Sequence, residues 1–221
     1  MQLFKQANLL LVLCGVLLLS RSAQAQTFVC VETNLGEFCM QMLETAAPNT
    51  VANFLKYVND GDYDQTFIHR AVAGFVIQGG GYKLDPLGEE VPQDPPILNE
   101  FSLANTRGTV AMAKFADSPN SATSEWFVNL SDNSPNLDFT NGGYTVFATI
   151  VKGLDLVVAI SNSLRVDLRS TLGDSFGELP VLVKDEDGVG IEDLIQVKRM
   201  YVAQNVVTDT DNDNVNQTAA Q

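Results

Sequence analysis

The stretch from Phe67 to Tyr82, with the sequence FIHRAVAGFVIQGGGY, restricts the possible folds more than any other part of the 221-residue chain. Two short apolar runs typical of β-strands flank Gly74. Arg70 and Gln78 lie inside these runs, where most side chains are expected to be buried. Buried polar groups need hydrogen-bond partners, which either the protein or a ligand provides. The stretch is therefore a candidate ligand site on a β-sheet.

The first 25 residues have the composition of a secretory signal peptide. Lys5 precedes an apolar run over residues 9–19, and the small-residue pattern AQA at 23–25 predicts cleavage after Ala25. The run is short for a membrane span. Cys14 permits a lipoprotein interpretation, which the bulky residue before it makes the weaker of the two. We expect a periplasmic or secreted protein without a membrane span.

Acidic residues outnumber basic ones, with 27 Asp and Glu against 13 Lys and Arg. Removal of residues 1–25 takes away two basic residues and no acidic one, so the mature chain carries a net charge of about −16. Such a charge repels nucleic acid and anionic membrane surfaces and favours solubility. We therefore expect no nucleic-acid partner.

A hairpin is expected near the start of the mature chain, because TNLG at 33–36 is a good turn signal. Pairing Glu32 with Glu37 across this turn places Cys30 opposite Cys39. Cross-strand neighbours lie close enough for a disulfide, and an exported protein meets an oxidising compartment. We predict a structural disulfide between the two cysteines, with two free thiols in adjacent strands as the alternative.

Many short strands and two helices are expected in the rest of the chain. Apolar residues at helical spacing predict helices over residues 48–61 and 153–160. Further strands are predicted over residues 109–113, 125–130, 144–151 and 194–203. This pattern indicates a mainly β fold, a barrel or a sandwich with helices closing its openings.

The remaining segments lack a regular pattern of apolar residues. Residues 83–100 are rich in proline and acidic residues and are predicted to form a long surface loop, while residues 161–192 are predicted to be irregular and acidic. The folded domain is expected to span residues 26–205. Residues 206–221 are predicted to be an acidic, disordered tail.

Motifs for covalent, metal and cofactor chemistry are weak. The segment GDSFG at 173–177 matches the G-x-S-x-G nucleophile motif, which requires a strand before it, a helix after it and a later histidine. The single histidine, His69, lies far upstream. One histidine and a cysteine pair provide no zinc site, and glycines 79–81 lack the spacing of a dinucleotide loop. We expect no metal and no cofactor, and a serine hydrolase using Ser175 is the weakest function considered.

The segment HRAVAGFVIQGGG at 69–81 resembles the cyclophilin signature, in which a His-Arg pair, a phenylalanine and a glutamine precede a run of glycines. The resemblance covers residues 27–203, is closest to exported bacterial members, and continues at matching spacing through residues 105–113, 121–130, 137–139 and 143–147. It implies a closed eight-stranded antiparallel β-barrel capped by two helices. It also implies peptidyl-prolyl cis–trans isomerase (rotamase) activity.

The implied reaction needs neither a nucleophile nor a metal, because rotation about an X–Pro bond requires only that amide resonance be lost. A fixed cation near the amide stabilises the twisted transition state more than the planar ground states. By the resemblance, Arg70 is this catalytic group; a solvated or salt-bridged surface arginine is the alternative. His69 corresponds to a structural position of the family.

The resemblance assigns a further set of residues to substrate binding: Phe75, Val76, Gln78, Ala113, Glu125, Phe127, Leu137 and Tyr144. The large apolar members are expected to hold the proline ring, with plain core packing as the alternative. Gln78 is expected to bond the substrate backbone. Tyr144 stands where many cyclophilins have histidine, and Glu125 where glutamine is usual. The carboxylate of Glu125 would either compete for Arg70 or orient it.

Two functions are consistent with these residues. The first is an active isomerase that acts on proline-containing polypeptides, assists the folding of exported proteins and works as a monomer. The alternative is a catalytically weak binding module or chaperone of the same fold, in which Glu125 neutralises Arg70. The joint presence of the predicted site residues favours the first.

Overall fold

The computed structural model describes residues 26–183 and 188–209. The predicted signal peptide, residues 1–25, and residues 210–221 of the predicted tail lie outside the described residues. Among the described residues, no helix has the length and apolar character needed to cross a membrane.

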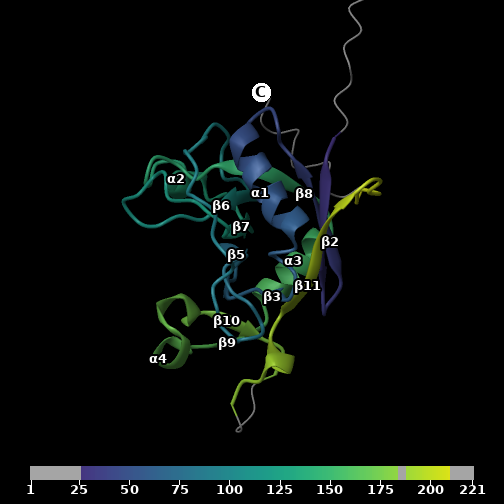
Figure 1. The fold of residues 1–221 in the computed structure, drawn as a ribbon, viewed down its shortest axis with the longest axis vertical. Helices are drawn as coiled ribbons and strands as arrows, with labels where there is room; N and C mark the ends of the chain where they lie inside the picture. The colour runs from purple at the N-terminus through teal and green to yellow at the C-terminus, as the bar shows by residue number, and fades with distance from the viewer. Residues whose placement is uncertain (1–25, 184–187, 210–221) are drawn as a thin grey trace, which may run out of the picture.

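One curled antiparallel sheet of nine strands forms the body of the molecule, in the order β3-β11-β1-β2-β8-β6-β7-β5-β4 (Figure 1). Its strands are β1 (Phe28–Thr33), β2 (Glu37–Met42), β3 (Thr66–Phe67), β4 (Arg70–Val72), β5 (Val76–Gly79), β6 (Thr109–Met112), β7 (Trp126–Asn129), β8 (Val146–Lys152) and β11 (Gln196–Ala203). The predicted mainly β, barrel-like fold is thus confirmed in outline.

The prediction of eight strands was wrong by one, for a reason visible at Ile68 and His69. The Ile68 amide donates to the carbonyl of Ile195, whereas the next amide, that of His69, donates to the carbonyl of Gln78. The chain therefore changes partners at this corner, and one extended run becomes the two short strands β3 and β4. These strands are the two ends of the sheet order and do not pair with each other, so the predicted closed barrel is instead a curled sheet whose ends are joined only by residues 68–69.

The hairpin β1–β2 has the predicted register, with Glu32 opposite Glu37 and Cys30 opposite Cys39. The two cysteines form the predicted disulfide, and their Cα atoms lie 4.1 Å apart. The turn is closed by the Thr33 amide, which donates to the carbonyl of Gly36 at 2.8 Å. Because β1 also pairs with β11, the N-terminal strand of the domain is held on both edges.

Two helices close the curled sheet, as predicted. Helix α1 (Pro48–Asp60) packs against β8 and β11, and α3 (Leu154–Ser161) packs against β2, β4 and β5. Proline suits the first turn of α1, and the helix ends at Gly61, whose φ of 74° favours glycine. The ring of Phe54 on α1 lies 4.8 Å from that of Phe147 on β8, in the centre of the apolar core.

Residues 162–183, called the arm below, were predicted to be irregular, but they form a small ordered unit. It contains β9 (Leu164–Val166), α4 (Arg169–Leu172), the short 3-10 helix η1 (Asp174–Phe176) and β10 (Leu179–Val181). A further 3-10 helix, η2 (Ile191–Asp193), follows the arm. Strands of three residues that include arginine or proline show no periodicity, which explains the incorrect prediction.

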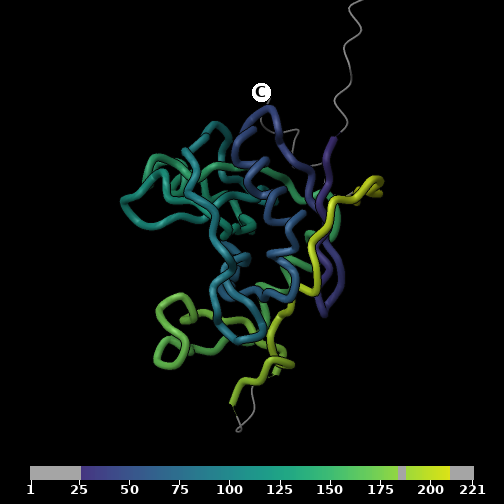
Figure 2. The backbone as a smooth tube through the Cα atoms, in the orientation of Figure 1, coloured from purple at the N-terminus to yellow at the C-terminus, as the bar shows by residue number. Residues whose placement is uncertain are grey.

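The arm has its own apolar core, separate from that of the barrel. Its buried members are Phe67, Leu84, Val166, Phe176, Leu179, Val181 and Leu194. Figure 2 shows the green arm as a lobe beside the end of the barrel opposite the loops around α2 (Ser134–Leu137). The lobe is therefore packed against β3 and the start of the 83–100 loop.

Replacement of both Cys30 and Cys39 by alanine should lower the free energy of unfolding by about 2–3 kcal/mol, because the unfolded chain regains the entropy of a closed loop. The sheet register should persist, since β1 remains paired with β2 and β11. Urea unfolding of the double variant and of the oxidised wild type measures the difference. Reduced wild type is the control and should match the variant; equal stability of oxidised protein and variant would contradict the prediction.

Candidate active site

Strand register places five outward-facing residues in one row across five neighbouring strands. Arg70 on β4 lies opposite Gln78 on β5, Gln78 opposite Phe127 on β7, Phe127 opposite Ala111 on β6, and Ala111 opposite Val146 on β8. Directly paired residues of a sheet point to the same face. A charged group, an amide and an apolar surface thus follow one another along a single line.

The opposite face of the same strands is fully apolar. The residues next to the row, one position along each strand, are buried in the barrel core: Ala71, Ile77, Val128, Val110 and Phe147. A shift of any strand by one residue would bury the row and expose these side chains, so the packing of the core holds the site in register.

An apolar cluster includes the three apolar residues of the row. Its buried members are Val76, Ala111, Phe127, Leu137 and Val146, and its partly buried members are Leu43, Phe75, Ala113 and Tyr144. Tyr144 meets Phe127 edge to face at 5.7 Å between ring centroids, and its amide donates to the carbonyl of Leu137. The structure therefore brings together all six apolar and aromatic residues that were predicted to bind substrate.

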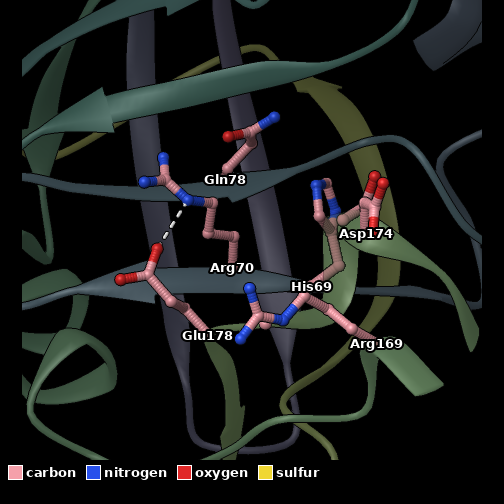
Figure 3. Close-up of a pocket in the computed structure, with 8 residues that line it drawn as sticks. His69, Arg70, Gln78, Arg169, Asp174 and Glu178 are labelled. Carbon is pink, nitrogen blue, oxygen red and sulfur yellow. Dashed lines mark hydrogen bonds and ion pairs between the residues drawn. The ribbon is translucent and has the colours of Figure 1, made fainter.

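Arg70 lies at one end of this cluster and is held by the arm. Its Nε donates to Oε2 of Glu178 at 2.8 Å, and the guanidinium carbon lies 5.9 Å from the ring centroid of Phe75. Figure 3 shows the two terminal nitrogens turned away from Glu178. The Ala71 amide donates to the carbonyl of Glu178, which fixes this residue beside β4. The Nε edge of the guanidinium is paired with Glu178, whereas the two terminal nitrogens point away from this carboxylate.

The carboxylate in contact with Arg70 is thus not that of Glu125. Glu125 Oε2 accepts a 2.6 Å hydrogen bond from Nε2 of Gln78 and lies 3.4 Å from Nε2 of His69. Burial alone would raise the pKa of Glu125, but the hydrogen bonds from His69 and Gln78 and the charge of His69 together hold it below the usual value. Glu125 is therefore an anion that orients Gln78 and does not pair with Arg70.

Residues 28–174 match the family described as cyclophilin type peptidyl-prolyl cis-trans isomerase/CLD. The chain belongs to the cyclophilin family. Similar curated proteins include the peptidyl-prolyl cis-trans isomerase of Acinetobacter baylyi, 42% identical over 154 residues that cover 68% of this chain and 80% of that protein. Peptidyl-prolyl cis-trans isomerase B of Escherichia coli is 42% identical over 139 residues, which cover 58% of this chain and 80% of that protein. This cyclophilin is accordingly a peptidyl-prolyl cis–trans isomerase.

The fold agrees with this membership. A solved cyclophilin-type isomerase of Cryptosporidium parvum superposes with a TM-score of 0.62 at 23% identity, covering 82% of this chain and 99% of that chain. At this identity the comparison concerns the fold. The family match ends at Asp174, so Glu178 and the end of the arm lie beyond it.

His69 of this cyclophilin is buried, with 1% of its side chain exposed, as expected of a structural position. It is not fully satisfied, because its Nδ1 has no hydrogen-bond partner among the described residues. Ser175 does not form a nucleophile elbow: it belongs to η1, which follows α4 rather than a strand, and its Oγ accepts a hydrogen bond from Tyr82 at 2.8 Å.

Lys114 supports the loop that carries Tyr144. Its Nζ donates to the carbonyls of Asn141 at 2.8 Å and Gly143 at 2.6 Å and lies 4.9 Å from the ring centroid of Tyr144. Burial lowers the pKa of Lys114. In the part of the chain that the structure describes, the grouped potential metal ligands are Cys30, Glu37 and Cys39. The disulfide removes both of these sulfurs as thiolate ligands.

Sequence reasoning missed four residues of the site, namely Leu43, Ala111, Val146 and Glu178. Ala111 lies two positions before Ala113 in a predicted strand, so the alternation of faces was a usable signal. No local signal was available for Glu178, which lies 108 residues after its partner Arg70.

Replacement of Glu125 by glutamine should destabilise the folded protein by about 1–3 kcal/mol at pH 7, because a charged acceptor facing Gln78 and His69 is lost. The lowered pKa of Glu125 means that its carboxylate stabilises the fold above the ordinary value for glutamate, about 4.3. This contribution is lost as the pH falls through the lowered pKa. The stability difference between wild type and variant should therefore shrink below about pH 4.3.

Urea unfolding of both proteins between pH 7 and pH 3 measures this difference. Glu44→Gln is the matched control, because Glu44 forms no hydrogen bond or ion pair within the described residues. A difference for Glu125→Gln that stays constant with pH would contradict the assigned role of the carboxylate.

Proposed function

We propose that this cyclophilin isomerises X–Pro bonds in exported proteins and assists their folding, with Arg70 stabilising the twisted amide. The observation that carries the proposal is the row in which Arg70, Gln78 and Phe127 lie side by side on one face of the sheet. A proline ring seated on the apolar cluster would place its amide next to the guanidinium. The guanidinium of Arg70, the amide of Gln78 and the apolar cluster would then each contact a different part of one substrate.

The reaction needs only electrostatic stabilisation of its twisted transition state. Rotation about an amide bond has a barrier of about 18–20 kcal/mol, because resonance is lost at the twisted geometry. Lowering this barrier by about 7 kcal/mol accelerates the step about 10⁵-fold. In the twisted state the carbonyl and the nitrogen are no longer conjugated, so a cation aimed at them stabilises that state more than either planar isomer.

Each residue of the row has a separate task in this proposal. The terminal nitrogens of Arg70, turned away from Glu178, donate to the substrate amide. Gln78 uses its Nε2 for Glu125, which leaves its carbonyl oxygen as an acceptor for a substrate N–H. Phe127 and Leu137, which belong to the apolar cluster, contact the proline ring. The solved isomerase of Cryptosporidium parvum in the presence of the dipeptide Ala-Pro supports a proline-containing substrate.

The alternative of a weakly active binding module is less favoured by the geometry. It was based on neutralisation of Arg70 by Glu125, whose carboxylate instead faces Gln78 and His69. Glu178 does pair with Arg70, but 33% of the Arg70 side chain remains exposed. A guanidinium carries five N–H donors, so one paired edge leaves donors for a substrate.

Arg70→Ala should reduce kcat/KM for a short X–Pro peptide by about 10²–10³-fold, the usual effect of removing one preorganised donor. The cis-to-trans conversion of the peptide by residues 26–221 measures the loss. Arg107→Ala is the matched control, because Arg107 is exposed and is not part of the row or the apolar cluster.

Unchanged catalysis by Arg70→Ala would refute the proposed role of the guanidinium. No catalysis by wild type, with peptide binding retained, would identify a binding module instead. Far-ultraviolet circular dichroism of each variant separates these outcomes from a loss of fold.

We further propose that the mature protein is periplasmic or secreted, based on the charged, apolar and small-residue pattern before Gln26. Expression of the full chain in a Gram-negative bacterium should yield an extracytoplasmic protein that begins at Gln26. Intact-mass analysis of the purified protein measures the cleavage site, and a signal-peptidase-resistant Ala23→Leu variant serves as the control. Retention of residues 1–25, or a lipid-modified Cys14, would contradict the proposal.

A further inference from the structure

A cavity of about 500 Å³ lies between the arm and strand β4. Its lining residues are His69, Arg70, Gln78, Arg169, Asp174, Ser175, Gly177 and Glu178. Arg70 and Gln78 line this cavity and also belong to the row of the candidate active site, whereas the apolar cluster has a different set of side chains. A polypeptide bound along the row would therefore pass the cavity, around which Figure 3 shows Arg70, Glu178, Arg169 and Asp174.

The wall that the arm contributes is held in place. Phe176 is buried, with its ring 4.6 Å from that of Tyr82 and 6.1 Å from that of Phe67. On the other side of the wall, the backbone of Glu178 accepts a hydrogen bond from the Ala71 amide at 2.9 Å. Phe176 lies between the lining residues Ser175 and Gly177, and Glu178 is itself a lining residue, so the arm is anchored to the barrel within the segment that lines the cavity.

The charges around the cavity do not balance. Arg70 is paired with Glu178 at 2.8 Å, and Arg169 is paired with both carboxylate oxygens of Asp167. The remaining charged group of the lining, Asp174, has no hydrogen bond or ion pair within the described residues. Both guanidinium groups thus have a carboxylate partner. Asp174 accepts no hydrogen bond among the described residues, although its charge also attracts Arg169, so three carboxylates surround two guanidinium groups once Asp167 is counted. His69, behind them, has an unpartnered Nδ1 with 1% of its side chain exposed.

We propose that this cavity is a specificity subsite that takes the basic side chain of a lysine or arginine close to the isomerised proline. The proposal rests on the proposed function, because it concerns the substrate of the same site. Asp174 supplies a carboxylate that accepts no hydrogen bond within the described residues, and Glu178 offers the oxygen that Arg70 does not use. An acidic side chain would be repelled by these two carboxylates, whereas the free donors of Arg70 are directed at the substrate amide in the proposed function.

The expected discrimination is modest, because the cavity is open to solvent. A partly exposed ion pair contributes enough for about a two- to fivefold preference. Salt screens such a pair, so the preference should weaken as ionic strength rises. The protein's overall negative charge would also attract basic peptides, and the experiment has to separate this general attraction from a local site.

The test compares peptides that share one X–Pro pair. Each peptide carries lysine, glutamine or glutamate at one of the two positions that flank this pair, either the residue before it or the residue after it. For wild type, kcat/KM should be about two- to fivefold higher with lysine than with glutamine at one position. Asp174→Asn should bring this ratio close to one. Asp155→Asn, which removes the same charge from the exposed surface of α3, should keep the wild-type ratio.

A lysine-to-glutamine ratio of one in wild type would overturn the proposal, and so would a ratio that survives in Asp174→Asn. Equal reductions in Asp174→Asn and Asp155→Asn would assign the preference to net charge and also overturn it. The same ratios are measured as Kd with fluorescently labelled peptides. Absence of turnover, which would refute the proposed function, therefore still leaves the subsite decided by binding.

Discussion

The site depends on the register of five antiparallel strands, and the core holds that register. Along each strand, alternate residues face the barrel interior, where Ile77, Val128 and Val110 are packed. Because the side-chain period of a strand is two, burial of this face determines which residues emerge on the other. Arg70 and Phe127 lie on the same face of the sheet, on either side of Gln78, for this reason, although they lie far apart in the chain. The packing that stabilises the core therefore also determines the geometry of the site.

The polar residues of the site form two separate groups, each held together by one carboxylate. Glu125 is committed to Gln78 and His69 at the inner side of the site, and Glu178 is committed to Arg70 at the outer side. A guanidinium can accept this arrangement because its donors form a rigid fork, so an anion on one edge leaves the other edge directed at a ligand. An excess of acidic residues in the chain is therefore compatible with catalysis by a cation, since the position of each carboxylate matters more than their number.

The arm shows how a family fold acquires a surface of its own. The small core around Phe176 anchors it independently of the barrel core, and the backbone bond between Ala71 and Glu178 brings it to the edge of β4. Edge strands have unpaired backbone groups, and covering them with another segment is a common solution. Here the covering segment also brings charged side chains beside Arg70.

The amino-acid sequence by itself determined the features that depend on neighbours in the chain. The turn between β1 and β2, the pairing of Cys30 with Cys39 and the two capping helices follow from local turn signals and from periods of two or 3.6 residues. Only the tertiary structure decided that the strand after Thr66 splits at the barrel corner, because two distant partners compete for consecutive amides. It also decided that Glu178 rather than Glu125 meets Arg70, since a contact across 108 residues leaves no local pattern.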